Sequence, residues 1–327
     1  MKVYVIGDGG WGTANALLLD SYGHDVTVWG AFPDYTREMV AAGENFRFLK
    51  GVKLPPTLKF TNDRALAAEA DIVVLAPPSK FFAGVMESFK GIVRDDQLVV
   101  SLTKGLCEKT NRRMTEIAEE ILGVKDVVAL AGPTHAEEVS RGIPTAIVAA
   151  CRDGAKAKRV QEVWSGPKFR VYTSPDPVGV EIGGCVKNVI AIAVGCSDGM
   201  GFGDNTRAAL ITRGLAEMKR FVLAYGGQPE TLSGLAGIGD LIVTCTSKHS
   251  RNHTVGERLG RGEKIGDILA SMQMVAEGVW NSKVVHELAL KLGVEMPISN
   301  LVYAACYGDF EAKDALAQMM ARELKSE

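Results

Sequence analysis

The residue with the clearest chemical potential is Lys187, which stands among small and apolar residues in the segment 181–191. A helix of this composition would be buried, and a buried ammonium without a partner is costly. Lys187 therefore needs either an acidic partner or a cleft to face, and a lysine that faces a cleft can deliver a proton. Gly183 and Gly184 precede it by one helical turn on the same face, where a ligand or a neighbouring backbone could come close. The alternative is a lysine that reaches the surface and pairs with Glu181.

An acidic partner is available at Asp240, the only acid in the apolar or small stretch 237–244. If this stretch is helical, Thr244 lies one turn later on the same face and could share the site. The alternative is that Asp240 caps a helix that begins after a glycine. Lys187, Asp240 and Thr244 together predict a centre for proton transfer.

A polar run at 247–254 leads into the next apolar helix and contains Ser250, Arg251 and Asn252. An arginine can bind a phosphate through two parallel hydrogen bonds, and the free N–H groups at a helix start attract an anion. The run therefore favours a phosphorylated substrate. The alternative is a solvated loop with ordinary capping by Asn252 or Thr254.

Two further polar segments follow predicted strands, at the sheet edge where folds of this class bind ligands. Lys104 comes just after the strand 98–102, and Gly132, Thr134 and His135 come just after the strand 127–131. The second segment could offer backbone N–H groups and a hydroxyl to a substrate. His135 invites an acid-base role, although a lone histidine in this position is more often a loop or capping residue.

A glycine pattern, Gly7-x-Gly9-x-x-Gly12, directly follows the strand 3–6 and opens the helix 13–21. Gly7 permits the tight turn, Gly9 lets backbone approach a pyrophosphate, and Gly12 lets helix and strand pack closely. The helix N-terminus then faces the negative charge. This context indicates a Rossmann dinucleotide-binding unit; the alternative is a glycine-rich turn without a ligand.

The choice between NAD and NADP stays open. An acid at the end of the second strand selects the ribose 2′-hydroxyl, and an arginine there accommodates a 2′-phosphate. After Trp29 the chain instead reads Gly-Ala-Phe-Pro, with Asp34 and Arg37 both late for these roles. We therefore expect NAD or NADP as the cofactor.

The elements that must position these residues fall into two groups. Short β-branched runs alternate with helical stretches up to a Pro-Asp-Pro cluster at 175–177, which predicts a doubly wound, mostly parallel sheet over residues 1–177. Residues 178–327 read as helices only, which predicts an all-α substrate-binding domain. The expected strands are 3–6, 25–29, 72–76, 98–102, 127–131, 146–150 and 170–172; the expected helices are 13–21, 80–89, 111–122, 155–164, 178–197, 206–225, 253–260, 278–292, 298–307 and 311–325.

Bulk properties exclude several classes of protein. The chain has 327 residues, enough for two cores, and 37 basic against 39 acidic residues do not suggest a nucleic-acid binder. Its six cysteines contain no Cys-x-x-Cys pair, and the N-terminus does not look like a signal peptide, so we expect reduced thiols in the cytoplasm. The apolar tract 178–197 is interrupted by Glu181 and Lys187, which favours a buried helix over a membrane span.

Taken together, these motifs closely resemble glycerol-3-phosphate dehydrogenase of the bacterial NAD(P)-dependent type over essentially the whole chain. The resemblance implies reversible NAD(P)H-dependent reduction of dihydroxyacetone phosphate to sn-glycerol 3-phosphate, which supplies phospholipid synthesis, by a homodimer without a metal. It rests on Gly-x-Gly-Gly-Trp-Gly-Thr-Ala at the N-terminus, Thr-Lys-Gly at 103–105, Gly-Pro-Thr-His-Ala at 132–136, Val-Lys-Asn at 186–188, the run 205–215, Gly-Ile-Gly-Asp-Leu at 237–241 and Ser-Arg-Asn at 250–252.

The resemblance also implies roles for individual residues. Lys187 would be the proton donor and acceptor, and the residues that organise the substrate around it would be Lys104, Asn188, Asp240 and Thr244. Arg251 and Asn252 would hold the substrate phosphate. Cofactor contacts would come from Gly10, Trp11, Lys104, Ala136, Arg251, Val275 and Glu277. The chain departs from the family at Gly10, where serine is frequent, and at Ala31, where arginine is common.

Two other classes of protein compete with this interpretation. A related two-domain dehydrogenase could act on a sugar acid or a hydroxyacyl thioester, and assays with those substrates would separate it. A regulator that senses a dinucleotide without catalysis would bind cofactor but leave the lysine at 187 unexplained.

Overall fold

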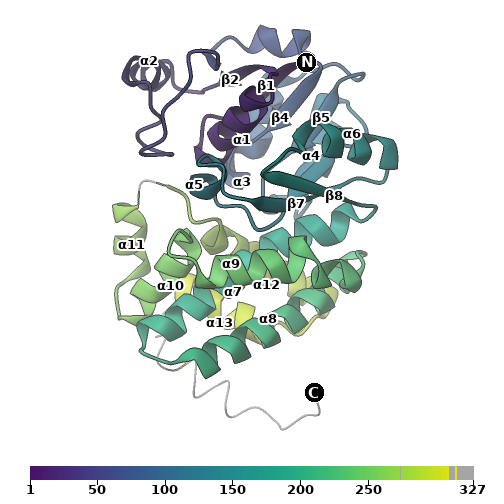
Figure 1. Ribbon diagram of the computed structural model, residues 1–327. Helices are drawn as coiled ribbons and strands as arrows, with labels where there is room; N and C mark the ends of the chain where they lie inside the picture. Colours follow the sequence, from purple (N-terminus) through teal and green to yellow (C-terminus); the bar gives the residue numbers. More distant parts are fainter. Residues whose placement is uncertain (273, 309–313, 315–327) are drawn as a thin grey trace.

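The computed structural model describes residues 1–272, 274–308 and 314, and it shows a sheet unit followed along the chain by a helical unit (Figure 1). One eight-stranded sheet has the order β3-β2-β1-β4-β5-β6-β7-β8. Its strands are β1 (Lys2–Ile6), β2 (Asp25–Trp29), β3 (Lys59–Thr61), β4 (Ile72–Leu75), β5 (Leu98–Ser101), β6 (Val128–Ala131), β7 (Thr145–Ala150) and β8 (Phe169–Ser174).

Both faces of this sheet are covered, because the central strands are apolar on both sides. In β1, Val3 and Val5 join one buried cluster, whereas Tyr4 and Ile6 join another. This alternation confirms the expected doubly wound arrangement. The helices of this unit are α1 (Gly10–Ser21), α2 (Pro33–Ala42), α3 (Ser79–Phe89), α4 (Met114–Leu122), α5 (Ala136–Val139) and α6 (Gly154–Trp164).

The sheet is mostly parallel, as expected, with one exception that the sequence did not reveal. β7 runs antiparallel to β6, and β8 then pairs with β7 in parallel. The carboxyl ends of β1, β4, β5 and β6 therefore share one edge, which places the turn after β1 near the segments after β5 and β6.

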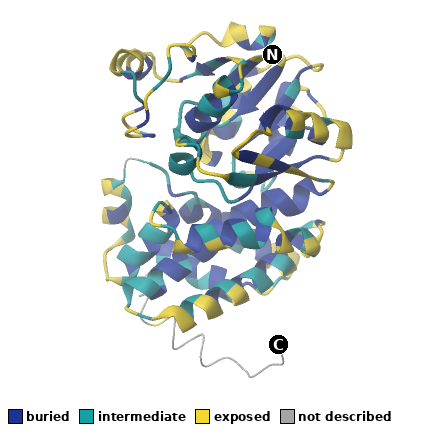
Figure 2. Ribbon diagram, in the orientation of Figure 1, coloured by how far each residue is buried: buried dark blue, intermediate teal, exposed yellow. Residues whose placement is uncertain are grey.

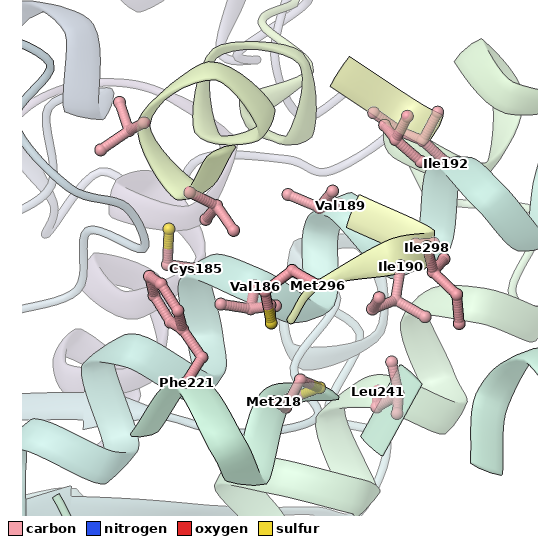
Figure 3. Packing of buried hydrophobic residues seen from close by; sticks show 14 of the residues in the cluster. Cys185, Val186, Val189, Ile190, Ile192, Met218, Phe221, Leu241, Met296 and Ile298 are labelled. Carbon is pink, nitrogen blue, oxygen red and sulfur yellow. The ribbon is translucent and has the colours of Figure 1, made fainter. Parts of the chain in front are cut away.

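The helical unit is built around α7 (Pro177–Gly199), whose residues are almost all buried. This helix is long and apolar enough to cross a membrane, but 94% of its most apolar window is buried inside the protein (Figure 2). Figure 3 shows its side chains Cys185, Val186 and Val189 within the main apolar cluster. It is therefore a core helix, as its interrupted composition predicts. Around it lie α8 (Asp204–Tyr225), α9 (Asp240–Thr246), α10 (Arg251–Gly260), α11 (Ile265–Ser271), α12 (Glu277–Leu292) and α13 (Pro297–Tyr307).

Glycines allow α10 to pack backbone against backbone on α7. A Cβ at Gly195 would lie 2.1 Å from the carbonyl oxygen of His253, and one at Gly256 would lie 2.0 Å from that of Ile192. This close packing brings the start of α10 beside Asn188 of α7. The helix expected at 311–325 lies outside the described residues, apart from position 314.

Candidate active site

Lys187 meets an acidic partner and a hydroxyl inside the protein. Its Nζ lies 2.8 Å from Oδ1 of Asp240 and 2.5 Å from Oγ1 of Thr244. All three residues are at most 5% exposed. The expected pairing is therefore present, with Lys187 on α7 and the other two residues one turn apart on α9.

The second oxygen of Asp240 binds another lysine, and this one comes from the sheet unit. Nζ of Lys104, which follows β5, lies 2.7 Å from Oδ2 of Asp240 and 3.0 Å from the carbonyl oxygen of Gly132. Oγ1 of Thr134 donates to the same carbonyl at 3.1 Å. One carboxylate thus joins two ammonium groups that belong to different structural units.

The alternative prediction, that Lys187 pairs with Glu181, is wrong because the Glu181 carboxylate binds other residues. Its carboxylate accepts hydrogen bonds from Nη1 of Arg113 at 2.5 Å, from N of Thr115 at 3.0 Å and from Oγ1 of Thr115 at 2.6 Å. Glu181 lies six residues before Lys187 on α7, and Lys187 stays buried instead of reaching the surface.

Asp240 is also not a capping residue. The segment before it, η3 (Leu235–Gly239), is a π-helix that continues directly into α9, so no helix end needs a cap there. Gly237 and Gly183 permit this path: a Cβ at Gly237 would lie 2.2 Å from the backbone of Leu232, and one at Gly183 would lie 3.3 Å from the carbonyl oxygen of Ala236. The carboxylate of Asp240 is therefore directed to the lysines.

Burial and charge together tune these groups. Burial lowers the pKa of Lys187 to about 8; the charge of Lys104 acts in the same direction, and Asp240 opposes both. Burial alone would raise the pKa of Asp240, but Lys104 and Lys187 hold it below the ordinary value. The site therefore combines an ionised carboxylate with a lysine that can exchange a proton near neutral pH.

His135 lies near the two lysines, and the sequence left open whether it has an acid-base role or a loop or capping role. It occupies the N-cap position of α5 but makes no capping bond with its side chain. Burial lowers its pKa, and Lys187 and Lys104 add to this effect, so the imidazole is neutral beside the two lysines. Its Nε2 is buried without a hydrogen-bond partner.

The start of α10 presents a helix N-terminus with an arginine. Ser250 caps the helix by accepting a hydrogen bond from N of His253 at 3.2 Å, so neither Asn252 nor Thr254 is the cap. Nη1 of Arg251 donates to the carbonyl oxygen of Val275 at 2.8 Å. Its side chain is otherwise exposed.

Asn252 and Asn188 connect this helix start to α7. Nδ2 of Asn252 donates to Oδ1 of Asn188 at 2.8 Å, and its Oδ1 accepts from N of Gly278 at 2.9 Å. Nδ2 of Asn188 in turn donates to the carbonyl oxygen of Gly184 at 3.1 Å. Asn188, which follows Lys187 in the chain, is thus held against the start of α10.

The turn after β1 has the shape that a dinucleotide requires. Gly7 has φ +117°, which favours glycine, and a Cβ at Gly12 would lie 2.2 Å from the carbonyl oxygen of Gly7. A Cβ at Gly9 would meet nothing within 4 Å, so this glycine leaves space beside the N-terminus of α1. The residues present therefore fit a pyrophosphate, with the helix N-terminus supplying N–H donors.

The departure at Gly10 has a physical reason here. A Cβ at this position would lie 2.5 Å from the carbonyl oxygen of Phe48, so a serine would require that segment to move. The same point lies 3.8 Å from Cβ of Ala136, which places Ala136 against the turn. Nε1 of Trp11 is buried without a hydrogen-bond partner, and Ala31 is exposed.

Glu277 joins the two units at the start of α12. Its carboxylate accepts hydrogen bonds from N of Ser79 at 3.0 Å and from Oγ of Ser79. Glu277, which we expect to contact the cofactor, thus accepts hydrogen bonds from the first residue of α3. Among the described residues, no group of three or more His, Cys, Asp or Glu side chains gathers as a metal site, and all six cysteines are free.

Comparison with known proteins gives one consistent result. Residues 2–157 match the family described as NAD-dependent glycerol-3-phosphate dehydrogenase N-terminus, and residues 176–317 match its C-terminus. The chain is 48% identical to glycerol-3-phosphate dehydrogenase [NAD(P)+] of Chlorobium limicola, covering 100% of this chain and 99% of that protein. It is 47% identical to the protein of the same name from Geobacter sulfurreducens, covering 100% and 98%.

The fold agrees with these matches. A crystal structure of glycerol-3-phosphate dehydrogenase from Coxiella burnetii superposes with a TM-score of 0.94 at 38% identity, and the match covers 98% of this chain and 99% of that one. The two-part architecture, the turn after β1 and the buried lysine pair all lie within the matched region. The chain therefore belongs to the NAD-dependent glycerol-3-phosphate dehydrogenase family.

Proposed function

We propose that this protein catalyses the reversible, NAD(P)H-dependent reduction of dihydroxyacetone phosphate to sn-glycerol 3-phosphate, the precursor of phospholipid synthesis. The observation that carries the proposal is the bridge from Lys187 through Asp240 to Lys104, because it links a buried lysine whose pKa is lowered to the sheet unit. Membership of the family and the names of its relatives support this reaction.

The turn after β1 would hold a nicotinamide cofactor, which would supply the hydride for C2 of the substrate or accept it from there. Lys187 donates its proton to the carbonyl oxygen as negative charge grows there, and it accepts the proton in the reverse direction. Asp240 orients the ammonium group, and Thr244 contributes a hydroxyl at 2.5 Å that restricts its rotation. Lys104 adds a second positive charge near the same oxygen, where it stabilises the developing alkoxide.

The substrate phosphate is assigned to the start of α10. The N-terminal N–H groups and the exposed guanidinium of Arg251 provide donors for a dianion. Ser250 and Asn252 are buried and hold the helix start in place, and Asn188 connects that position to Lys187 on the same helix. Binding at this remote point would fix C2 relative to the lysines. Gly132 and Thr134 would line the opposite side.

The cofactor is assigned to the turn formed by Gly7, Gly9, Gly10, Trp11 and Gly12. Ala136 packs against this turn. Val275 and Glu277 are assigned to the cofactor from the helical unit, where Val275 accepts a hydrogen bond from Arg251 and Glu277 accepts one from Ser79 of the sheet unit. We propose residues 1–177 as the cofactor domain and 178–327 as the substrate domain. In support, two apolar clusters lie entirely within the first range, and a third takes all its buried members except Leu106 from the second. A homodimer in the cytoplasm is the arrangement that we propose for the working enzyme.

Parallel initial rates with NADH and NADPH test the reaction and the cofactor together. Purified protein should oxidise either or both dinucleotides only when dihydroxyacetone phosphate is added. Sugar acids and hydroxyacyl thioesters, tested at the same concentration, should give rates at least about 100-fold lower, because they lack the phosphate placed for Arg251. Binding of dinucleotide without any substrate-dependent absorbance change would overturn the proposal in favour of a sensor.

A further inference from the structure

Asp8 brings a carboxylate to a place where the second strand has none. It stands between Gly7 and Gly9 in the dinucleotide turn, but its side chain extends toward the end of β2. A Cβ built on Gly30, the first residue after β2, would lie 2.5 Å from Oδ2 of Asp8 and 2.6 Å from Oγ1 of Thr36. Asp8 therefore occupies the volume that a side chain at position 30 would fill.

The position of Asp8 is fixed by its backbone. Its carbonyl oxygen accepts hydrogen bonds from Nδ2 of Asn45 at 2.8 Å and from Oγ1 of Thr13 at 3.3 Å. The same Nδ2 also donates to Oγ1 of Thr13 at 2.7 Å, which links all three residues. This network holds the backbone of Asp8 in place beside Asn45 and Thr13.

One oxygen of this carboxylate lacks a hydrogen-bond partner. Oδ2 of Asp8 is buried and accepts no hydrogen bond, and burial raises the pKa of this carboxyl. Its charge is felt nearby, since it adds to the burial that raises the pKa of Tyr35 on α2. A buried acceptor without a donor is costly, so a ligand hydroxyl would supply the hydrogen-bond donor that the protein does not provide for this carboxylate.

Nearby arginines do not compensate this charge or prepare a phosphate site. Arg37 pairs with Asp34, and Arg47 pairs with Glu38 and stacks over the Tyr35 ring, 4.5 Å from its centroid. Position 31, next to Gly30, is alanine. At the end of β2, the residues that the structure describes thus present a negative group without an adjacent free cation.

In sheets of this class, an acid at the end of the second strand receives the ribose 2′-hydroxyl of NAD. We propose that Asp8 performs this role from the neighbouring turn, so that the site selects a ribose with a free 2′-hydroxyl and rejects a 2′-phosphate by charge repulsion. The inference rests on dinucleotide binding at the β1–α1 turn and does not depend on which substrate is reduced. It narrows the cofactor from NAD or NADP to NAD.

Binding measurements with ADP-ribose and 2′-phospho-ADP-ribose test this directly, because these ligands lack nicotinamide and need no substrate. Calorimetry on the wild-type protein should show that the phosphorylated ligand binds at least about 10-fold more weakly, as expected for like charges at close range. In Asp8→Asn, which keeps the size of the side chain, the ratio of the two dissociation constants should fall at least about fivefold, mainly because the phosphorylated ligand binds more tightly. NADH and NADPH should follow the same order.

Asp34→Asn is the matched control, because Asp34 is an exposed acid on α2, the helix that follows β2. It should leave the ratio within about twofold of the wild-type value, since a solvated charge is well screened. An unchanged ratio in Asp8→Asn, an equal change in Asp34→Asn, or a wild-type preference for the phosphorylated ligand would each overturn the proposal. If the protein fails to reduce dihydroxyacetone phosphate but the ratio responds to Asp8, only the proposed reaction falls.

Discussion

Asp240 carries one negative charge between two lysine ammonium groups, so its immediate surroundings hold excess positive charge inside the protein. Such an excess disfavours the apo state and favours a ligand that develops negative charge, which a carbonyl does during reduction. The cluster is therefore better suited to catalysis than to stability. Lys187 sits deeper than Lys104, whose side chain is 17% exposed, and this difference explains why we assign the proton to Lys187.

Replacement of Lys187 tests the assignment of the proton. Lys187→Met removes the donor while retaining the length of the side chain, so kcat for dihydroxyacetone phosphate reduction should fall on the order of 1000-fold. The dissociation constant for NADH, measured by fluorescence titration, should stay within about twofold because the cofactor turn lies in the other unit. Lys291→Met, at an exposed lysine on α12, is the control and should leave both values unchanged. Near-normal turnover in Lys187→Met would mean that another group delivers the proton.

The pairing of Lys187 with Asp240 could be predicted from the sequence. A lysine in an apolar helix requires compensation, and Asp240 was the only acid in a comparably apolar stretch, so their pairing could be predicted. The contact of Lys104 with the same carboxylate could not, because it depends on how two units dock. The direction of the Asp8 side chain was equally hidden, since it follows from the space that Gly30 leaves.

The close packing of α7 against α10 depends on individual glycine residues. Gly256→Ala places a methyl group 2.0 Å from the carbonyl oxygen of Ile192, so the two helices must separate. We expect this variant to lose about 1–3 kcal/mol of unfolding free energy in urea denaturation. Because the start of α10 moves with the helix, KM for dihydroxyacetone phosphate should rise as well.

Gly266→Ala is the matched control on α11, where a Cβ would meet nothing within 4 Å. Alanine favours a helix more than glycine does, so this variant should be neutral or gain up to about 1 kcal/mol. Equal stability of the two variants would show that α7 and α10 do not pack as closely as described.

Several elements were not predicted from the sequence. β3 has only three residues and gains its order by pairing with β2, and α2, which starts at Pro33, was not among the expected helices. The reversed direction of β7 is a property of strand pairing, which no local pattern encodes. The long helices and buried strands could be predicted because each carries its own apolar periodicity.

In the whole molecule, several polar contacts tie the sheet unit to the helical unit. They include Lys104 with Asp240, Arg113 with Glu181, Lys283 with Glu108, and Ser79 with Glu277. The Arg113–Glu181 pair is nearly inaccessible, with side chains 6% and 4% exposed, and it lies away from the lysine cluster. Its role is therefore to hold α4 against α7.

Loss of this contact should destabilise the protein without altering the chemistry. Arg113→Met leaves the carboxylate of Glu181 buried without its cation, which should cost about 3–5 kcal/mol of unfolding free energy. Arg112→Met is the control: its partner Glu120 is exposed, so the loss should be at most about 1 kcal/mol. Urea denaturation compares the free energies of unfolding of the two variants. A similar loss in both would contradict the conclusion that the buried Arg113–Glu181 pair stabilises the protein.

The most direct test of the central assignment follows kcat/KM against pH in both directions on the same enzyme. Reduction needs protonated Lys187, and oxidation needs neutral Lys187. As the pH rises through the free-enzyme pKa of about 8, kcat/KM for reduction should therefore fall and kcat/KM for oxidation should rise. Removing the charge that raises the pKa of Lys187, in Asp240→Asn, should move both transitions to lower pH together. If the two directions respond to pH in the same sense, or if Asp240→Asn leaves both transitions in place, Lys187 is not the proton carrier.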